Sequence, residues 1–212
     1  MAKKSPAKKV VKKAIKKVAT KAKPKKVVKK AAKKTTQPLK KTVAKKSAKK
    51  VAVKTVKFTA HQTHLKAGDK APYFEGKDQF GNTVSLNGLA GKTIILYFYP
   101  KDDTPGCTAT ACSLRDEYKI LNKSNYAVVG VSADNEKSHS KFAAKYELPF
   151  PLLADVDHKI MKAYDVWGKK QFMGRVFDGI IRTTFIIGSD GIIKEVINKV
   201  DTANHAQQIL NA

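Results

Sequence analysis

Positive charge is concentrated at one end of this chain, and that separation limits how much of the chain can fold. The first 57 residues contain 24 of the 43 Lys+Arg side chains and none of the 17 acidic ones. The other 155 residues hold 19 basic and all 17 acidic side chains, a net charge of +2. The overall charge of +26 therefore belongs almost entirely to residues 1–57. The body, residues 58–212, is nearly neutral and long enough to bury a core of its own.

The tail, residues 1–57, is built mainly from lysine doublets separated by Ala, Val, Thr and three prolines. It has no acidic or aromatic residue and cannot bury enough apolar surface to offset its ordering entropy, so we predict that it is disordered when free. Its composition resembles the tails of linker histones and of histone-like bacterial proteins. Because lysines neutralise nucleic-acid phosphates without reading the base sequence, we expect non-specific nucleic-acid binding through residues 1–57. Another polyanion, an anionic membrane surface, and a solubilising or targeting role are the alternatives.

Several classes of protein are excluded by what the sequence lacks. It has no run of about 18 apolar residues, so no membrane insertion is expected. Its N-terminus has no apolar stretch like that of a secretory signal, and two cysteines do not make a secreted disulfide scaffold. We expect an intracellular, soluble, cytoplasmic protein, which the tail would bring to the nucleoid, or to the nucleus in a eukaryote.

The body shows strand and helix patterns in alternation. Its most apolar stretch, Thr93–Tyr99, predicts a buried strand that ends at Pro100. Further strands are expected at Ala127–Val131, Leu152-Leu153, Thr183–Ile187 and Ile192–Ile197, the last two as a hairpin. Helices are expected at residues 105–122, Asn135–Glu147, Val156–Tyr164 and Ala203–Leu210. This order predicts an α/β fold with a central sheet covered on both faces, and the terminal hairpin makes the sheet mixed.

The two cysteines, Cys107 and Cys112, lie five residues apart at the start of the first predicted helix. Thr104 is placed to cap this helix and Pro105 suits its first position, so Cys107 falls in the first turn. There, free N–H groups and the positive end of the helix dipole favour the thiolate, the reactive form of a cysteine. A buried structural cysteine is the alternative, and the Thr-Pro-Gly context favours the reactive one.

The spacing of the two cysteines also limits what their thiols can do together. On an intact helix their Cα atoms are roughly 8–9 Å apart, whereas a disulfide needs less than about 7 Å. Cys107 and Cys112 can therefore bond only if the start of the helix unwinds. A zinc site is the competing interpretation, but none of the five histidines lies at ligand spacing from these cysteines.

Residues 100–108, PKDDTPGCT, match the active-site pattern Pro-x-x-x-Thr-x-x-Cys of the peroxiredoxin family. The continuation through Ala111-Cys112 to Leu114-Arg115-Asp116 resembles peroxiredoxin Q, the bacterioferritin comigratory protein subfamily. Other stretches that resemble this subfamily are residues 78–81 (DQFG), 148–153 (LPFPLL), 164–168 (YDVWG) and 179–185 (GIIRTTF). The resemblance runs from about Leu65 to the C-terminus, so the tail lies outside it.

The resemblance implies a thioredoxin-like fold and a thiol peroxidase that reduces hydrogen peroxide and organic hydroperoxides. It assigns Cys107 as the peroxidatic cysteine, Cys112 as the resolving cysteine that forms a disulfide with it, and thioredoxin as the reductant. It also implies that Thr104 orients the thiolate and the peroxide, that Pro100 shields the site, and that Arg182 lies beside the thiolate. No metal or other cofactor is implied, and the subfamily is often monomeric. A nucleic-acid-binding protein on a reused scaffold is the alternative function.

One position departs from the subfamily pattern, and two others are expected to have structural roles. Members of the subfamily often carry Glu two residues before the resolving cysteine, where this chain has Thr110. The difference removes a carboxylate from the helix start, close to the thiols. Arg115, one turn beyond Cys112, is expected to be structural, and Trp167 is expected to pack rather than to bind substrate.

Overall fold

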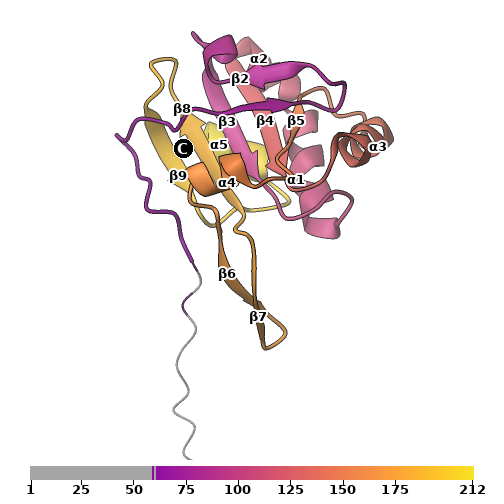
Figure 1. Ribbon diagram of the computed structural model, residues 1–212. Helices are drawn as coiled ribbons and strands as arrows, with labels where there is room; N and C mark the ends of the chain where they lie inside the picture. Colours follow the sequence, from indigo (N-terminus) through magenta and orange to yellow (C-terminus); the bar gives the residue numbers. More distant parts are fainter. Residues whose placement is uncertain (1–58, 60) are drawn as a thin grey trace, which may run out of the picture. The chain divides into compact units, whose positions relative to one another are not determined.

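The computed structural model describes residue 59 and residues 61–212, so the predictions made for the tail lie outside the described residues. At its centre is a five-stranded sheet with the strand order β5-β4-β3-β8-β9 (Figure 1). The strands of this sheet are β3 (Thr93–Phe98), β4 (Tyr126–Ser132), β5 (Leu152–Ala154), β8 (Thr183–Ile187) and β9 (Ile193–Ile197). Two separate hairpins pair β1 (Glu75–Lys77) with β2 (Thr83–Ser85), and β6 (Trp167–Phe172) with β7 (Arg175–Ile180).

The helices of the described part are short. They are α1 (Pro105–Asp116), α2 (Tyr118–Lys123), α3 (Glu136–Tyr146), α4 (Lys159–Ala163) and α5 (His205–Leu210), with a 3₁₀ turn, η1, at Asn87–Leu89. The longest of them, α1, has 12 residues. None of the helices among the described residues has the length and apolar character needed to cross a bilayer.

The central sheet is mixed, as the sequence predicts. β3 pairs in parallel with β4, and β4 pairs in parallel with β5, whereas β8 runs antiparallel to both β3 and β9. Parallel neighbours need a crossover connection, which α1 and α2 supply between β3 and β4, and α3 supplies between β4 and β5. Thr183 of β8 lies opposite Phe98 of β3. The residue before β8 is therefore carried to the end of β3.

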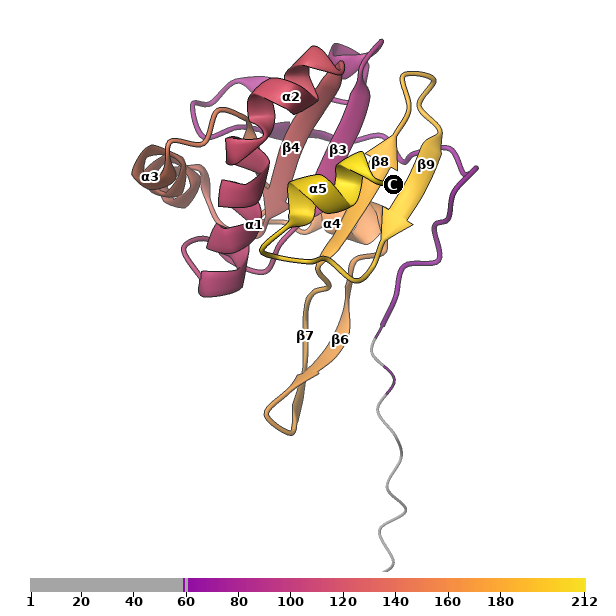
Figure 2. The same ribbon diagram turned by 180° about the vertical axis from the view of Figure 1, so that it is seen from behind.

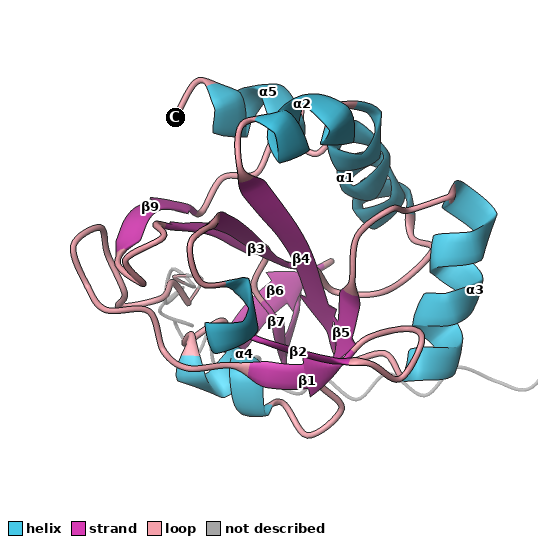
Figure 3. Cartoon of the chain, turned by 90° about the horizontal axis from the view of Figure 1, so that it is seen from above, coloured by secondary structure: helices cyan, strands magenta, loops and turns pink. Residues whose placement is uncertain are grey.

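Strand β3 contributes side chains to both faces of the sheet, because successive side chains of a strand point in opposite directions. Ile95 and Tyr97 enter a buried cluster that α1, α2 and α5 cover. Ile94 and Leu96 enter a second cluster, which α4 and the chain around β1 and β2 cover. Figure 2 shows α1, α2 and α5 against the sheet, and in Figure 3 α4 and β1 lie on the other side. Two cores therefore meet at one strand.

The helix predicted over residues 105–122 is wrong in one respect, because the chain forms two helices there. The break lies at Glu117, whose backbone (φ −93°, ψ 5°) ends α1 and begins α2. The amides of Ile120 and Leu121 both donate to the carbonyl oxygen of Glu117, at 3.0 Å, and so start a new turn. No glycine or proline marks this position, so the sequence carries no signal for the break.

The helix predicted from Val156 begins only at Lys159, so the prediction is wrong for residues 156–158. The carboxylate of Asp155 accepts from the amides of Lys159 and Met161, at 2.8 Å each, and thereby fixes the start of α4. His158 has a left-handed backbone (φ 59°), which a continuous helix does not allow. The other predicted helices and strands are confirmed to within two residues at their ends.

Two hairpins are absent from the sequence prediction. β1 and β2 have only three residues each and lie in a segment whose glycines indicate turns. The loop between β6 and β7 is Met173-Gly174, and both residues have positive φ (49° and 78°), as in a type I′ turn. Methionine seldom adopts this conformation, so the sequence does not predict the turn. In Figure 1 this hairpin extends away from the five-stranded sheet.

A buried polar network fastens the loop between β3 and α1. The carboxylate of Asp102 accepts hydrogen bonds from Tyr99 Oη at 2.8 Å and from Ser138 Oγ at 2.7 Å. His139 is fully buried; its Nδ1 lies 2.9 Å from this carboxylate and its Nε2 lies 3.2 Å from the carbonyl oxygen of Leu153. Each ring nitrogen of His139 therefore has an oxygen within hydrogen-bond distance. The network ties the loop to α3 and β5.

Removing one partner of the Asp102–His139 pair should destabilise the fold. Asp102→Ala leaves the buried side chains of Tyr99, Ser138 and His139 without their hydrogen-bond partner, so we expect the free energy of unfolding in urea to fall by about 3–5 kcal/mol. Asp178→Ala is the matched control, because this carboxylate pairs with Lys169 on the exposed surface, 2.7 Å away, and should matter little. Equal losses for the two variants would contradict a special contribution from the buried pair.

Candidate active site

The candidate site begins where β3 ends. After Pro100 the chain makes a short loop and enters α1, with Thr104 in the position before the helix and Pro105 as its first residue, as the sequence predicts. Thr104 is extended (φ −95°, ψ 149°), and the proline ring fixes the next residue in a helical φ. The hydroxyl of Thr104 makes no capping hydrogen bond and instead donates to the carbonyl oxygen of Lys101, at 3.0 Å.

Cys107 lies in the first turn of α1 and is 1% exposed. Arg182 Nη2 lies 3.2 Å from its Sγ. The guanidinium thereby places a positive charge and an N–H donor beside the sulfur. Arg182 reaches the helix because it directly precedes β8, whose first residue, Thr183, lies opposite Phe98 at the end of β3.

The same guanidinium also contacts the first turns of α1. Its Nη1 lies 3.2 Å from Thr110 Oγ1 and 3.5 Å from the carbonyl oxygen of Gly106. A Cβ at Gly106 would lie 3.4 Å from Nη2, so the guanidinium rests against the helix start at van der Waals distance. Thr110, where this chain departs from the subfamily, is therefore a direct neighbour of Arg182.

Cys112 lies more than one turn further along the same helix. Both cysteines are free thiols, and α1 is unbroken from one to the other. Cys112 is half-buried, and the next residue, Ser113, accepts a hydrogen bond at its Oγ from the amide of Ala206, at 3.1 Å. This contact holds the second half of α1 against α5. The disulfide between Cys107 and Cys112 stays a prediction that requires the helix start to open.

Pro100 and Thr104 lie at the two ends of the loop that leads from β3 into the helix. Both are half-buried. Among the described residues Thr104 makes no hydrogen bond to Cys107, and its hydroxyl is occupied by the loop carbonyl of Lys101. The structure thus brings Cys107, Thr110 and Arg182 together, while the roles of Pro100 and Thr104 toward a peroxide stay predictions.

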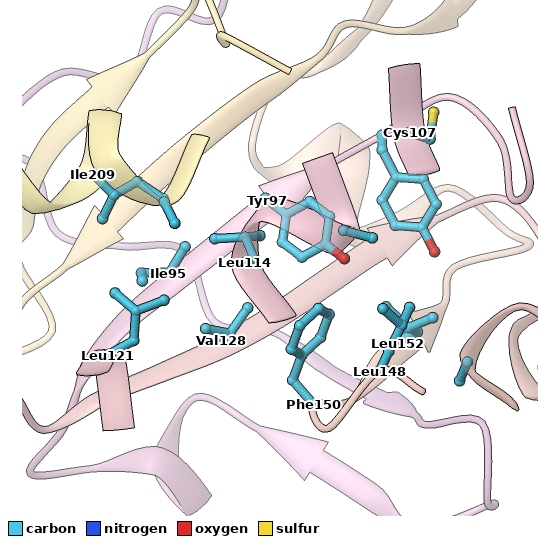
Figure 4. Packing of buried hydrophobic residues seen from close by; sticks show 14 of the residues in the cluster. Ile95, Tyr97, Cys107, Leu114, Leu121, Val128, Leu148, Phe150, Leu152 and Ile209 are labelled. Carbon is cyan, nitrogen blue, oxygen red and sulfur yellow. The ribbon is translucent and has the colours of Figure 1, made fainter. Parts of the chain in front are cut away.

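Two further side chains lie near the thiol and were not identified from the sequence. Lys170 of β6 donates from Nζ to the carbonyl oxygen of Ile180, at 3.1 Å. Burial lowers the pKa of Lys170 and the charge of Arg182 lowers it further, whereas Cys107 opposes this shift. Burial also raises the pKa of Tyr97, which shares a cluster with Cys107 (Figure 4). Lysines are abundant in this chain and the sequence did not predict β6, so no sequence signal identifies Lys170 as a residue near the thiol.

This fold and this arginine-bound thiol define a class of protein, the enzymes that use a cysteine thiolate at a helix start for redox chemistry. Residues 67–196 match the model of the AhpC/TSA family. The chain belongs to this family. The tail, residues 1–57, lies outside the matched segment.

Two relatives are similar over almost their whole length. Peroxiredoxin Bcp of Escherichia coli is 46% identical over 147 residues, which cover 69% of this chain and 94% of that protein. Peroxiredoxin Bcp of Bacillus subtilis is 42% identical over 146 residues, which cover 69% of this chain and 93% of that protein. The chain is thus a peroxiredoxin of the Bcp type, a thiol peroxidase and an oxidoreductase.

Solved structures show the same architecture. Peroxiredoxin Q of Xanthomonas campestris superposes with a TM-score of 0.62 at 35% identity and covers 65% of this chain and 87% of that one. Peroxidoxin BcpB from Mycobacterium tuberculosis also gives a TM-score of 0.62, at 33% identity, and covers 70% of this chain and 96% of that one. These neighbours confirm the thioredoxin-like fold that the sequence motifs implied.

A buried histidine near the site should make stability depend on pH. His205, the first residue of α5, is fully buried, and its Nε2 lies 2.9 Å from Thr184 Oγ1. Burial lowers the pKa of His205 and so does the charge of Arg182, while the hydrogen bond to Gln208 opposes the shift. The unfolded chain therefore takes up this proton at higher pH than the folded protein does.

Because the folded-state pKa of His205 is depressed, stability is complete above the ordinary value of about 6.5 and falls as the pH drops through it. We expect the free energy of unfolding to decrease between about pH 7.5 and pH 5 more steeply in the wild type than in His205→Gln, which takes up no proton there. Urea unfolding at a series of pH values measures both curves. Parallel curves would contradict a contribution from His205.

Proposed function

We propose that this chain reduces hydrogen peroxide and organic hydroperoxides at Cys107. The observation that carries the proposal is the 3.2 Å contact between Arg182 Nη2 and the Cys107 sulfur. The thiolate attacks one peroxide oxygen, an S–O bond forms and the O–O bond breaks. The second oxygen takes up a proton and leaves as water or an alcohol, and Cys107 becomes a sulfenic acid.

The neighbours of Cys107 have separate roles in this proposal. Arg182 holds the cysteine as a thiolate and donates N–H groups to the peroxide oxygens while charge develops on the leaving oxygen. Thr104, directly before the helix, orients the thiolate and the peroxide. Pro100, at the other end of the loop, shields the site. The support for these two roles is their place in the motif and in the loop that enters α1.

Cys112 completes the catalytic cycle. Its thiol condenses with the sulfenic acid: an S–S bond forms, the S–O bond breaks, and the thiol proton leaves with the hydroxyl group as water. Because α1 is intact between the two cysteines, its start must first unwind. A dithiol protein of the thioredoxin type then reduces the disulfide by thiol exchange. The cycle needs no metal or other cofactor and runs in a monomer.

Substitution of the two cysteines separates the two steps. We expect Cys107→Ser to abolish peroxide consumption with thioredoxin and its reductase, because the nucleophile is lost. Cys112→Ser should form the sulfenic acid once, consuming about one equivalent of peroxide per chain, and then stop because resolution is lost. Stopped-flow peroxide consumption and trapping of the sulfenic acid measure both. Full multi-turnover activity of Cys107→Ser would overturn the assignment.

The tail supports a second property of the same enzyme. We propose that residues 1–57 form a separate segment that binds nucleic acid non-specifically, beside an enzyme domain at residues 58–212. Its 24 lysines, with no acidic residue, are the observation that favours this. Such binding would keep a cytoplasmic peroxidase at the nucleoid, or at chromatin in a eukaryote, where it removes peroxide close to the nucleic acid.

The salt dependence of DNA binding tests whether the tail binds nucleic acid. We expect the full chain to retard duplex DNA of unrelated sequences in gel shifts and to lose affinity steeply as salt rises, since each neutralised phosphate adds about 0.9 to the logarithmic salt slope. A chain of residues 58–212 should bind weakly and with a small slope. Equal, weak binding by both chains would exclude nucleic acid as the ligand of the tail.

A further inference from the structure

Thr110 makes two polar contacts that its neighbours on α1 do not make. It is 1% exposed and lies one helical turn after Gly106. Its Oγ1 donates to the carbonyl oxygen of Gly106, at 2.9 Å, and accepts from Arg182 Nη1, at 3.2 Å. A hydroxyl has one proton to donate and lone pairs to accept with, so both bonds form at once. The buried hydroxyl therefore joins two segments: Gly106 in the first turn of α1 and Arg182, which directly precedes β8.

The contact with Arg182 fixes the orientation of the guanidinium. One terminal nitrogen, Nη1, points to Thr110 Oγ1, and the other, Nη2, points to Cys107 Sγ. Because the guanidinium is planar and rigid, anchoring one arm sets the direction of the other. Thr110 therefore controls how well Arg182 is aimed at the sulfur, although its own hydrogen bonds go to Gly106 and Arg182.

The contact with Gly106 concerns the stability of the helix start. A threonine that bonds back to a carbonyl four residues earlier loosens a helix slightly when nothing else holds it. Here the same hydroxyl also accepts from Arg182, which directly precedes β8 and is held by the pairing of β8 with β3. The first turn of α1 is thereby tied to the central sheet. This is the turn that must open before Cys107 can reach Cys112.

We infer that Thr110 is a positioning residue that promotes the peroxide step and restrains the resolving step. This inference rests on the proposed function of the two cysteines. With the hydroxyl present, Arg182 is aimed at the thiolate and the helix start stays closed. Without it, Nη1 keeps only its longer, 3.5 Å contact with the Gly106 carbonyl oxygen. Arg182 is then aimed less firmly, attack on peroxide slows, and the first turn of α1 opens more readily. The two rates must therefore move in opposite directions.

Thr110→Val tests this inference, because valine fills the same space, has a similar helix propensity and lacks the hydroxyl. In single-turnover quenched flow, we expect the second-order rate of sulfenic acid formation to fall about 3- to 10-fold, the range set by the loss of one or two hydrogen bonds. The peroxide-independent rate of Cys107–Cys112 disulfide formation should rise by a similar factor. Thr110→Ser, which keeps the hydroxyl, should restore both rates.

Thr108→Val is the matched control, since Thr108 lies on the same turn and its side chain makes no hydrogen bond to any described residue. It should leave both rates close to those of the wild type. If Thr110→Val slows both steps, or leaves both rates unchanged as Thr108→Val does, the inference is overturned, because it requires the two rates to move in opposite directions.

Amide hydrogen exchange gives a readout that does not depend on peroxide. In the reduced protein, residues 107–111 should exchange faster in Thr110→Val than in the wild type, Thr110→Ser or Thr108→Val, since the helix start opens more often. Unchanged exchange would overturn the restraint on the helix. If instead the wild type forms no sulfenic acid, the proposed function fails, while the exchange comparison still decides whether Thr110 holds the turn.

Discussion

The pairing of β3 with its two neighbours is the constraint on which the rest of the structure depends. β3 lies between a parallel partner, β4, and an antiparallel one, β8, and its alternating side chains enter both buried clusters. The helices on either face pack onto what this strand presents to them. The chain leaves the C-terminal end of β3 and enters α1 after a short loop. The position of this strand therefore also sets the position of the helix start.

The reactive thiol depends on a contact between segments that are far apart in the chain. Arg182 lies 75 residues after Cys107 and reaches it because the register of β8 against β3 carries the preceding residue to the start of α1. Thr110 then links the same guanidinium to the turn that holds the thiol. One arginine thus contacts both the thiol and the helix start, and this shared contact is the basis of the coupling that we propose between the peroxide step and the unwinding step.

Sequence patterns predicted most of the described elements and failed at particular residues. The failures lie where a backbone conformation is imposed by its surroundings rather than signalled by glycine or proline. Glu117 breaks a helix through its carbonyl contacts, and Asp155 sets the start of α4 with its carboxylate. At the loop of β6 and β7 a methionine, Met173, adopts a left-handed conformation. Because the sequence did not predict this hairpin, it also did not identify Lys170 of β6, whose pKa is lowered by burial and by the charge of Arg182.

The sequence by itself determined the separation of the lysine-rich tail from the neutral body, the buried central strand, and a cysteine at a helix start with a second one five residues on. These features follow from charge, apolar runs and local spacing, which are properties of neighbouring residues. The motif resemblance implied that Arg182 lies beside the Cys107 thiolate, but it gave no sign of the contact with Thr110. Only the tertiary structure placed its two arms on Cys107 and Thr110. Strand register decides this placement, because it fixes which distant residues become neighbours.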